Sequence, residues 1–519
     1  MKHAPGYLVL LFSIIVPGLT VHAQQFTRTQ LPTTLESPWE ITYGPDNHLW
    51  LTESNGRVSR VDPVSGNKSV IFTAPDYFAG SDLENNTACN LTMGTGTFGL
   101  ALHPDFQNPD SAFVYFLYSY NSGSQNAPAT KFKVRRLKWS AAQQQVTENV
   151  DLITMLPSGF DHLGGRVMAV KRNGKNYLFV SIGDNGASED NSPTCYTPQS
   201  TNPNNQAQNP LTKNGKIHRF NMNGSVPSDN PLAGNSMYTR GHRNPQGLIY
   251  NPVKDILYDV EHGDRTDDEI NVLEGGKNYG WKYVRGYHGD NNYPGEAAYV
   301  ANYSPYPGIA NDGLKEPLAT WCSVPQPGFA PDQWCTVAPS DGIYYGSPAI
   351  TQWTNSLLVV TLKDGTNVRR GVHQFKLNEA GTALQDTPAL YFADDHDKNG
   401  RLRDIAVSPD GKKIYLINNG GSPTGDRITV YEQNTSSVTE TGYNPSLISI
   451  FPNPGEDRLQ ITGAKEQSVV EFYSVMGSLA ASETLSGNTV STAALSHGCY
   501  VVKVIAVDGG IKMLSWIKK

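Results

Sequence analysis

The sequence predicts an all-β protein that consists of a large β-propeller followed by a small β-sandwich, and three observations support this prediction. Only 17% of the 519 residues are charged, while the chain contains 49 glycines and 34 prolines, a composition typical of short strands joined by turns. Long helical heptads are absent. Hairpins recur as a loose internal repeat over residues 38–433.

The chain begins with a segment typical of secretion signals. Residues 1–23 contain one lysine, an apolar run from Tyr7 to Ile15 and the small-residue exit Val21-His22-Ala23. The run is shorter than the ~20 apolar residues that a membrane-spanning helix needs. We therefore expect a signal peptide over residues 1–23, cleaved after Ala23, and export of the protein.

Charge and cysteine content limit the classes of partner and cofactor. The formal net charge is −7 and no block of lysine and arginine occurs, so we expect no nucleic-acid partner and no anionic membrane. The five cysteines are too few for a disulfide scaffold and lack CxxC metal-site spacing. The pairs Cys322–Cys335 and Cys89–Cys195 are both conceivable, and the sequence alone does not decide between pairings.

Each copy of the internal repeat consists of a strand, a turn and a second, strongly apolar strand. Residues 43–51, 103–116, 251–258 and 408–417 follow this pattern, with Pro, Gly, Asp or Asn in the turn. The apolar strands are hydrophobic on both faces, as in sheets that stack on one another. Such hairpins predict a propeller over residues 24–433, since that fold leaves only short, protected edges. The uneven spacing indicates inserted loops at 186–215 and 286–340.

The composition changes at residues 434–444, a polar linker, and residues 445–519 have the pattern of a compact β module. Its opening Ile450-Phe451-Pro452-Asn453-Pro454 and its late Gly498–Lys503 segment resemble the C-terminal (Por) sorting domains of the type IX secretion pathway. This resemblance implies recognition by that secretion machinery and translocation across the outer membrane. The alternative is an ordinary Ig-like accessory domain. The terminal position of the module, and its lack of a cluster of histidine or acidic residues that could carry out chemistry, favour the sorting role.

A first candidate site pairs His162, which follows Asp161, with Asp184 at the return of the next strand. A histidine beside a carboxylate can act as a general base near neutral pH, because the carboxylate fixes the tautomer and stabilises the imidazolium. The alternative is a surface histidine that simply bonds to its acidic neighbour.

A second candidate site occupies residues 241–281. Arg243 and Asn244 supply donors suited to a carboxylate or a developing alkoxide. The loop Glu261–Glu269 contains four acids and suits Ca²⁺, although it lacks the EF-hand spacing. The alternative is a polar loop between blades that Arg265 holds in place.

A third group consists of positive charges at strand ends. Alternation places Arg401 and Arg403 on one face of a strand, and Lys363 ends another apolar strand. Each could be a solvated strand end. Together with His162 and Arg243, however, they indicate an anionic, planar cofactor.

Eight motifs in order resemble the soluble glucose/sorbosone (aldose) dehydrogenases that use pyrroloquinoline quinone (PQQ). The motifs are Asp161-His162 with Gly165-Arg166, Ile182-Gly183-Asp184, GHRNPQGL at 241–248, DDEIN at 267–271, NYGW at 278–281, WCTVAPS at 334–340, residues 358–363, and Arg401–Asp404. The resemblance covers residues 38–433. It implies a six-bladed propeller with PQQ and Ca²⁺ in a cleft on one face.

The resemblance also implies roles for single residues. His162 would be the base that takes the proton of the sugar C1 hydroxyl, Asp184 would orient it, and Arg243 would stabilise the negative charge on the quinone oxygen. The residues implied to lie at the cofactor are Asn244, Trp334, Thr336, Lys363, Arg401 and Arg403. Backbone carbonyls of Gly263 and Asp264 would bind the active-site Ca²⁺. The residues implied for a second, structural Ca²⁺ are Glu269, the Tyr279 carbonyl and Asp290.

The sequence departs from the family pattern near the expected sugar. Gly94 or Thr95, and Ser188 or Glu189, stand where the family has glutamines that contact the sugar, and Asp264 replaces a proline. These departures bear on the identity of the sugar more than on the cofactor.

The expected function is that of an exported quinoprotein, secreted or at the cell surface, which oxidises the C1 hydroxyl of aldoses to lactones. Hydride would pass to PQQ with the help of His162, and electrons would pass to an external acceptor. Two alternatives stay open: a non-catalytic propeller that binds glycans or a partner protein, and a Ca²⁺-dependent lactonase or lyase. The sequence does not reveal the sugar, the acceptor, whether the protein forms a homodimer, or whether the C-terminal module is cleaved.

Overall fold

The computed structural model describes most of the chain as two compact units, Met1–Asn434 and Thr435–Lys519, and each is described here by itself. The described residues are 26–78, 96–123, 130–159, 161–186, 205–264, 266–290, 293–321, 336–365, 368–434, 448–474, 478–507 and 511–519. The expected signal peptide, most of the expected linker, Trp334 and the cysteines at 89, 195, 322 and 335 lie outside them.

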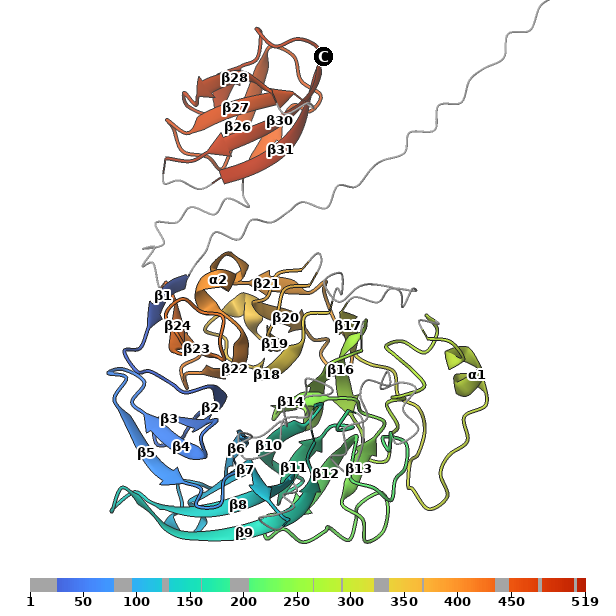
Figure 1. Ribbon diagram of the computed structural model, residues 1–519. Coiled ribbons are helices and arrows are strands. Elements are labelled where there is room, and N and C mark those ends of the chain that lie inside the picture. The colour runs from blue at the N-terminus through green and yellow to red at the C-terminus, as the bar shows by residue number, and fades with distance from the viewer. Residues whose placement is uncertain are drawn as a thin grey trace, which may run out of the picture. The chain divides into compact units, whose positions relative to one another are not determined.

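Six four-stranded antiparallel sheets make up the strands of the first unit (Figure 1). The first three are β2 (Pro38–Tyr43), β3 (Leu49–Glu53), β4 (Arg57–Val61) and β5 (Lys68–Thr73); β6 (Thr97–Leu102), β7 (Phe113–Asn121), β8 (Thr130–Ser140) and β9 (Gln145–Pro157); and β10 (Gly164–Arg172), β11 (Lys175–Ile182), β12 (Lys216–Asn221) and β13 (Met237–Arg240). The others are β14 (Pro245–Asn251), β15 (Ile256–Glu261), β16 (Asp268–Leu273) and β17 (Ala319–Trp321); β18 (Pro339–Tyr345), β19 (Ser356–Thr361), β20 (Val372–Lys376) and β21 (Ala389–Tyr391); and β22 (Leu402–Val407), β23 (Lys413–Asn418), β24 (Ile428–Gln433) and β1 (Phe26–Gln30).

The sheets surround a common axis. The first strands β2, β6, β10, β14, β18 and β22 contact one another in this cyclic order, and β22 in turn contacts β2 (Figure 1). The N-terminal strand β1 pairs with β24, with Phe26 opposite Gln433, so that the start of the chain completes the last sheet. The last sheet therefore joins the two ends of the first unit. The prediction of an all-β propeller is confirmed.

The two-sided apolar strands of the sequence form the packing between neighbouring sheets. Every residue of β3 and of β19 is buried. Leu117 and Phe132 of one sheet belong to the same core cluster as Leu178 and Val180 of the next. Because each sheet is covered by another on both faces, its strands are apolar on both faces.

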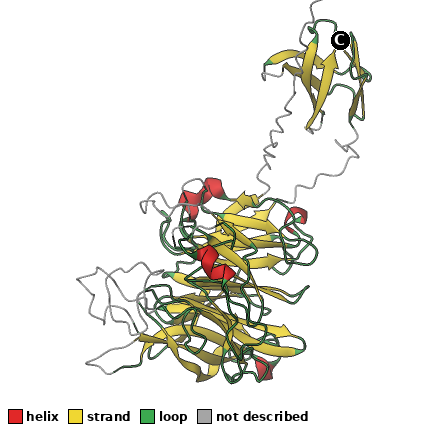
Figure 2. Ribbon diagram, turned by 90° about the vertical axis from the view of Figure 1, so that its right-hand side faces the viewer, coloured by secondary structure: helices red, strands yellow, loops and turns green. Residues whose placement is uncertain are grey.

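Helices are few among the described residues (Figure 2). They are α1 (Glu296–Ala301), α2 (His396–Asn399) and the 3-10 turns at Pro109–Ser111, Thr351–Trp353 and Ala393–Asp395. None of these helices has the length and the apolar content needed to cross a membrane.

A register irregularity recurs near the start of the first strand in all six sheets. The shifts fall between Pro38 and Glu40, Thr97 and Leu100, Gly164 and Val167, Pro245 and Gly247, Pro339 and Asp341, and Leu402 and Asp404. Bulges re-aim side chains and are common beside functional sites. Here they accompany acidic residues that meet at the axis.

Arg166 in β10 binds these acidic residues. Its guanidinium pairs with Glu40, with Asp341 at 2.9 Å and with Asp404 at 3.2 Å. It also donates to the carbonyl oxygens of Gln246 and Ser340. One buried side chain therefore connects five of the six sheets.

Three carboxylates share this one cation. Burial raises the pKa of Glu40 to about 8 and those of Asp341 and Asp404 to about 7, although the charge of Arg166 acts in the opposite direction. The axis therefore contains more carboxyl groups than cations. The charge of Arg166 offsets part of the free-energy cost of burying these carboxyls.

The second unit contains two antiparallel sheets. They are β25 (Ser449–Phe451), β26 (Arg458–Thr462) and β29 (Thr489–Ser491), and β28 (Leu479–Thr484), β27 (Val469–Ser474), β30 (Gly498–Ile505) and β31 (Ile511–Lys518). Leu459 and Val490 of the first sheet share a core with Phe472, Val502 and Trp516 of the second.

Arg166→Met should lower the free energy of unfolding by about 3–5 kcal/mol, because it leaves three buried carboxylates without a cation. Their raised pKa values mean that the folded state favours the protonated carboxyls, so stability falls as the pH rises through these values. The loss should therefore be larger at pH 8 than at pH 5 in urea unfolding. Arg57→Met, at an exposed pair with Glu36, should change stability by less than about 1 kcal/mol. An equal loss at both pH values would contradict this account.

Candidate functional site

A cavity of about 460 Å³ lies where all six sheets meet. Most of its lining residues lie at the start of a first strand or the end of a second strand, and these points are neighbours in an antiparallel pair. Asp268 instead begins the third strand β16. They are Trp39, Phe98, Asp161, His162, Leu163, Arg243, Asn244, Gln246, His262, Gly263, Asp264, Asp268, Thr336, Ala338, Leu362, Lys363, Arg401 and Arg403. The volume lies within the range of small-molecule sites.

His162 lies just before β10 and is held by Asp184, which follows β11. Nδ1 of His162 is 2.8 Å from a carboxylate oxygen of Asp184. The same carboxylate accepts hydrogen bonds from Asn205 at 2.8 Å, from the indole of Trp281 at 2.7 Å and from the Gly186 N–H at 2.9 Å. Because these donors fix the carboxylate, Asp184 can orient the imidazole.

Gly183 permits the close approach of the two loops that carry this pair. A Cβ atom at position 183 would lie 1.9 Å from the carbonyl oxygen of His162. His162 itself has a positive φ of 50°, an uncommon conformation for a non-glycine residue. The structure therefore needs glycine at 183 to keep His162 beside Asp184.

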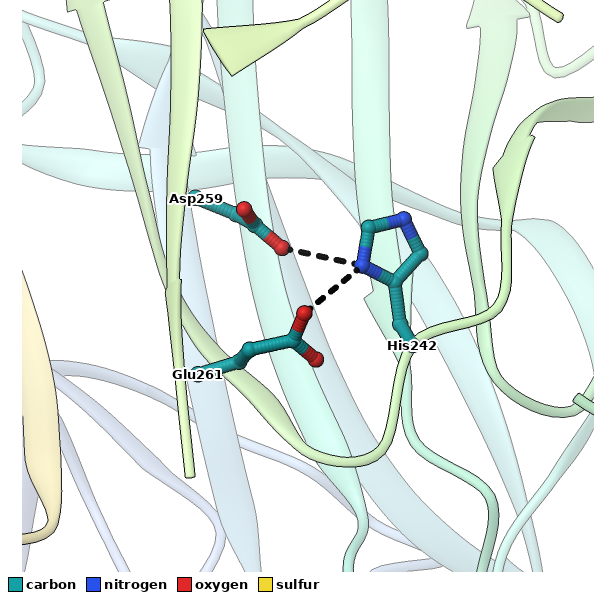
Figure 3. Close-up of side chains that lie close together, drawn as sticks. All are labelled: His242, Asp259 and Glu261. Carbon is teal, nitrogen blue, oxygen red and sulfur yellow. Dashed lines mark hydrogen bonds and ion pairs between the residues drawn. The ribbon is translucent and has the colours of Figure 1, made fainter. Parts of the chain in front are cut away.

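Arg243 is held through its backbone by a buried ion cluster of His242, Asp259 and Glu261 (Figure 3). Nδ1 of His242 lies 3.1 Å from Asp259 and 3.2 Å from Glu261. Burial alone would lower the pKa of His242, but the two carboxylates raise it to about 9. The second oxygen of Glu261 accepts the Arg243 backbone N–H at 3.0 Å, so the cluster fixes the start of β14.

The Arg243 side chain lies among groups of the neighbouring loops. It donates to the carbonyl oxygen of His262 at 3.3 Å and lies 3.6 Å from the Asp264 carboxylate. Its guanidinium carbon is 5.4 Å from the ring centroid of Trp281. The cation is thus held at the cavity wall.

The cavity carries more positive charge than its carboxylates balance. Burial lowers the pKa of Arg403 to about 9, and the charges of Arg401 and Arg166 add to this effect. The Nε atom of Arg403 is buried and has no hydrogen-bond partner among the described residues. Burial also lowers the pKa of Lys363, which Asp268 partly offsets. Such a donor set suits a ligand with several carboxylates.

Two of the residues expected to bind metal, Gly263 and Asp264, line the main cavity. They also line a smaller cavity beside it, together with the cations Arg243 and Arg285. The Asp264 carboxylate pairs with Arg285 at 2.9 Å. This second cavity, of about 10 Å³, is large enough for one water molecule or ion.

Glu269 and Tyr279 line this second cavity together with Glu261 and Asp267. Burial and the charge of Glu261 raise the pKa of Glu269 well above its ordinary value. Three buried carboxylates around a small space fit a hard cation. Asp290 does not line this space in the described part of the chain, and its charge instead acts on Glu296.

Most of the predicted site residues therefore meet at one cavity: His162, Arg243, Asn244, Gly263, Asp264, Thr336, Lys363, Arg401 and Arg403. Asp184 does not line the cavity but accepts a hydrogen bond from His162, and Trp334 lies outside the described residues. Sequence reasoning assigned no role to Gln246, His262 or Asp268, which also line the cavity. The alternation of β14, which puts Gln246 on the same side as Asn244, was a signal for the first of them.

Comparison with known proteins agrees with this geometry. The family model described as Glucose / Sorbosone dehydrogenase matches residues 35–425. The chain belongs to the glucose/sorbosone dehydrogenase family. A second model, described as Secretion system C-terminal sorting domain, matches residues 449–516. Both resemblances drawn from the sequence motifs are confirmed.

Relatives and solved structures of the dehydrogenase family are similar over most of their length. Quinoprotein glucose dehydrogenase B of Acinetobacter calcoaceticus is 30% identical, over 83% of this chain and 91% of the relative. Aldose sugar dehydrogenase YliI of Escherichia coli (strain K12) is 27% identical, over 78% and 92%. The PQQ-bound form of aldose sugar dehydrogenase from Streptomyces coelicolor superposes with a TM-score of 0.54 at 22% identity, over 79% of this chain and 99% of that chain, which supports the fold.

Arg403→Met should leave the melting temperature of the ligand-free protein unchanged or higher, because it removes a buried cation that repels Arg401 and Arg166. The comparison variant is Arg60→Met, since Arg60 is a buried arginine that is paired with Asp46 at 2.6 Å. That variant should melt lower, by about 2 °C or more. Calorimetry of both variants checks the prediction. A clear loss of stability in Arg403→Met would contradict the view that the charge of Arg403 is repelled by its neighbours in the ligand-free protein.

Proposed function

We propose that this protein is an exported, PQQ-dependent dehydrogenase that oxidises the C1 hydroxyl of aldose sugars to lactones and passes the electrons to an external acceptor. One observation carries the proposal: His162, which Asp184 orients, lines the same cavity as the positively charged side chains of Lys363, Arg401 and Arg403. The names of the relatives, which include quinoprotein and aldose sugar dehydrogenases, point the same way.

The cavity residues fit PQQ, a planar tricarboxylate with an o-quinone. Its carboxylates and quinone oxygens would be held by Asn244, Thr336, Lys363, Arg401 and Arg403, and Trp334 stays a further predicted member of this set. The buried Nε donor of Arg403 lacks an acceptor among the described residues, as expected of a group that binds a ligand. When bound, PQQ would supply the acceptor for two electrons as a hydride.

His162 would remove the proton from the sugar C1 hydroxyl. Because its Nδ1–H donates to Asp184, Nε2 keeps a lone pair for that proton. Asp184 would then stabilise the imidazolium, held in place by Trp281 and Asn205. Arg243, fixed at the cavity wall, would stabilise the negative charge on the quinone oxygen.

Two calcium ions would complete the site. The backbone carbonyls of Gly263 and Asp264 are proposed to bind the ion at the cavity, where it would act as a Lewis acid. Glu269, the Tyr279 carbonyl and Asp290 are proposed for a structural ion, with the small carboxylate-lined cavity as support for the first two. Asp290 is the least supported member, since it does not line that space.

The architecture that we propose has six blades, one for each four-stranded sheet, and a C-terminal β-sandwich formed by the two sheets that share one core. Residues 1–23 are proposed as a signal peptide and residues 434–444 as a linker. Residues 445–519 would direct export through the type IX machinery to the cell surface or the medium, which the match to a sorting-domain model supports.

Two other functions are less well supported. A propeller that only binds glycans has no use for a buried carboxylate that orients a histidine. A Ca²⁺-dependent lactonase or lyase does not require the four cationic side chains that line the cavity.

Adding PQQ and Ca²⁺ to the purified apo-protein should produce dye-linked oxidation of at least one aldose. PQQ should also stabilise the fold, raising the melting temperature roughly with the logarithm of its concentration once that exceeds Kd. Citrate, another tricarboxylate, serves as a control for charge alone and should give no activity. If the protein binds no PQQ and oxidises no aldose, the proposed function is wrong.

His162→Ala should leave the affinity for PQQ within about threefold of wild type while turnover falls by about 10²–10⁴-fold, because the variant loses only its general base. His48→Ala provides a control, since His48 lies in the β2–β3 turn and bonds only to a backbone carbonyl. Spectroscopic PQQ titration and steady-state kinetics separate the two effects. A parallel loss of PQQ affinity would show that His162 binds the cofactor rather than the proton.

Deleting residues 445–519 should abolish export while the retained propeller keeps its activity, since the two units are separately compact. The measurement compares dehydrogenase activity in the medium and in the cell. The control is the variant Cys499→Ser, which alters an exposed thiol of the same unit and should be exported normally. Normal export of the truncated protein would refute the sorting role.

A further inference from the structure

Four polar side chains on the cavity wall form a chain of hydrogen bonds with a fixed direction. Nη1 of Arg403 donates to Oε1 of Gln246 at 2.9 Å. A guanidinium has only donors, so the Gln246 oxygen must face Arg403 and its amide nitrogen must point onward. That nitrogen donates to Oδ1 of Asn244 at 3.0 Å.

The next link fixes the tautomer of His262. Oδ1 of Asn244 also accepts the backbone N–H of Gly164 at 3.1 Å, which orients the amide independently. Nδ2 of Asn244 therefore faces Nδ1 of His262, at 3.3 Å. An amide nitrogen can only donate, so Nδ1 of His262 accepts and the ring proton is on Nε2.

The chain ends in a donor without an acceptor. Nε2 of His262 is buried, and no described residue accepts a hydrogen bond from it. His262 lines both the main cavity and the small cavity beside it. A buried donor without an acceptor is uncommon and calls for a partner that is not part of the chain.

The surroundings decide what this partner is. Because Nε2 carries the ring proton, it can only donate, so its partner is a hydrogen-bond acceptor rather than a cation. Arg243 and Arg403 line the same cavity as His262. An oxygen with negative charge would be attracted by both arginines and by the N–H itself.

We propose that His262 is a positioning residue whose Nε2–H donates a hydrogen bond to an oxygen of PQQ in the main cavity, with the direction imposed by Arg403, Gln246 and Asn244. This inference rests on the proposed PQQ-dependent function. The inference explains why both ends of the Asn244 amide bond to protein groups. Its oxygen accepts from Gln246 and Gly164, and its nitrogen donates to His262 and so keeps the His262 ring proton on Nε2.

Two variants of His262 separate the two ring nitrogens. His262→Asn keeps a polar atom near the Nδ1 position but has none at Nε2, whereas His262→Gln can place an N–H near Nε2. Titration with PQQ should show at least about tenfold weaker binding for His262→Asn and a loss within about threefold for His262→Gln. KM for the aldose should stay unchanged in both. Melting curves of the ligand-free variants establish that both are folded.

Equal PQQ affinity of His262→Asn and wild type would overturn the inference alone. So would unchanged PQQ affinity with a raised KM, because the donor would then face the sugar. Absence of PQQ binding by wild type would overturn the proposed function and this inference with it.

A measurement on the wild-type protein does not depend on the folding of variants. In protein labelled with ¹⁵N-histidine, the ring proton of His262 should be found on Nε2 with and without PQQ. Exchange of that proton with water should become slower when PQQ binds, as it does for a hydrogen-bonded donor. A ring proton on Nδ1, or exchange that PQQ does not slow, would overturn the inference.

Discussion

The guanidinium of Arg166 is the interaction on which the rest of the first unit depends. It joins β10 to Glu40 in β2, to Asp341 in β18 and to Asp404 in β22, and it also bonds to the backbone of β14. These are the strands whose starting residues line the main cavity. The positions of the site residues relative to one another therefore follow from contacts at the axis, a few residues further along the same strands.

Arg166 also separates two regions of opposite charge. On one side the carboxyls of Glu40, Asp341 and Asp404 outnumber it, and their pKa values are raised. On the other side its charge adds to that of Arg401 and lowers the pKa of Arg403. The ligand-free protein thus retains repulsion among cavity cations that an anionic ligand would relieve. Proteins are commonly less stable than they could be at binding sites, because binding requires charged or polar groups that have no partner until the ligand is present.

The sequence predicted the propeller well because two-sided apolar strands and turn residues are local signals, and it predicted the cavity residues because eight motifs occur in family order. It could not predict which groups face inward after the bulges at the start of each first strand. Nor could it show that the Asp264 side chain pairs with Arg285, or that Asp290 is not among the described residues that line the small cavity. The role inferred for His262 depends on the direction of hydrogen bonds between residues far apart in the chain, which no spacing encodes.

The geometry finally explains how a base and a cation can work as one unit. The Asp184 backbone N–H donates to the Arg243 carbonyl oxygen at 2.8 Å, while the Arg243 N–H donates to Glu261 in the buried ion cluster. The Asp184 side chain in turn holds His162. A displacement of either loop would therefore move the proposed base His162 and the proposed charge-stabilising cation Arg243 together. Because backbone bonds and buried charges fix both groups within the protein, their separation does not depend on a ligand, as preorganised catalysis would require.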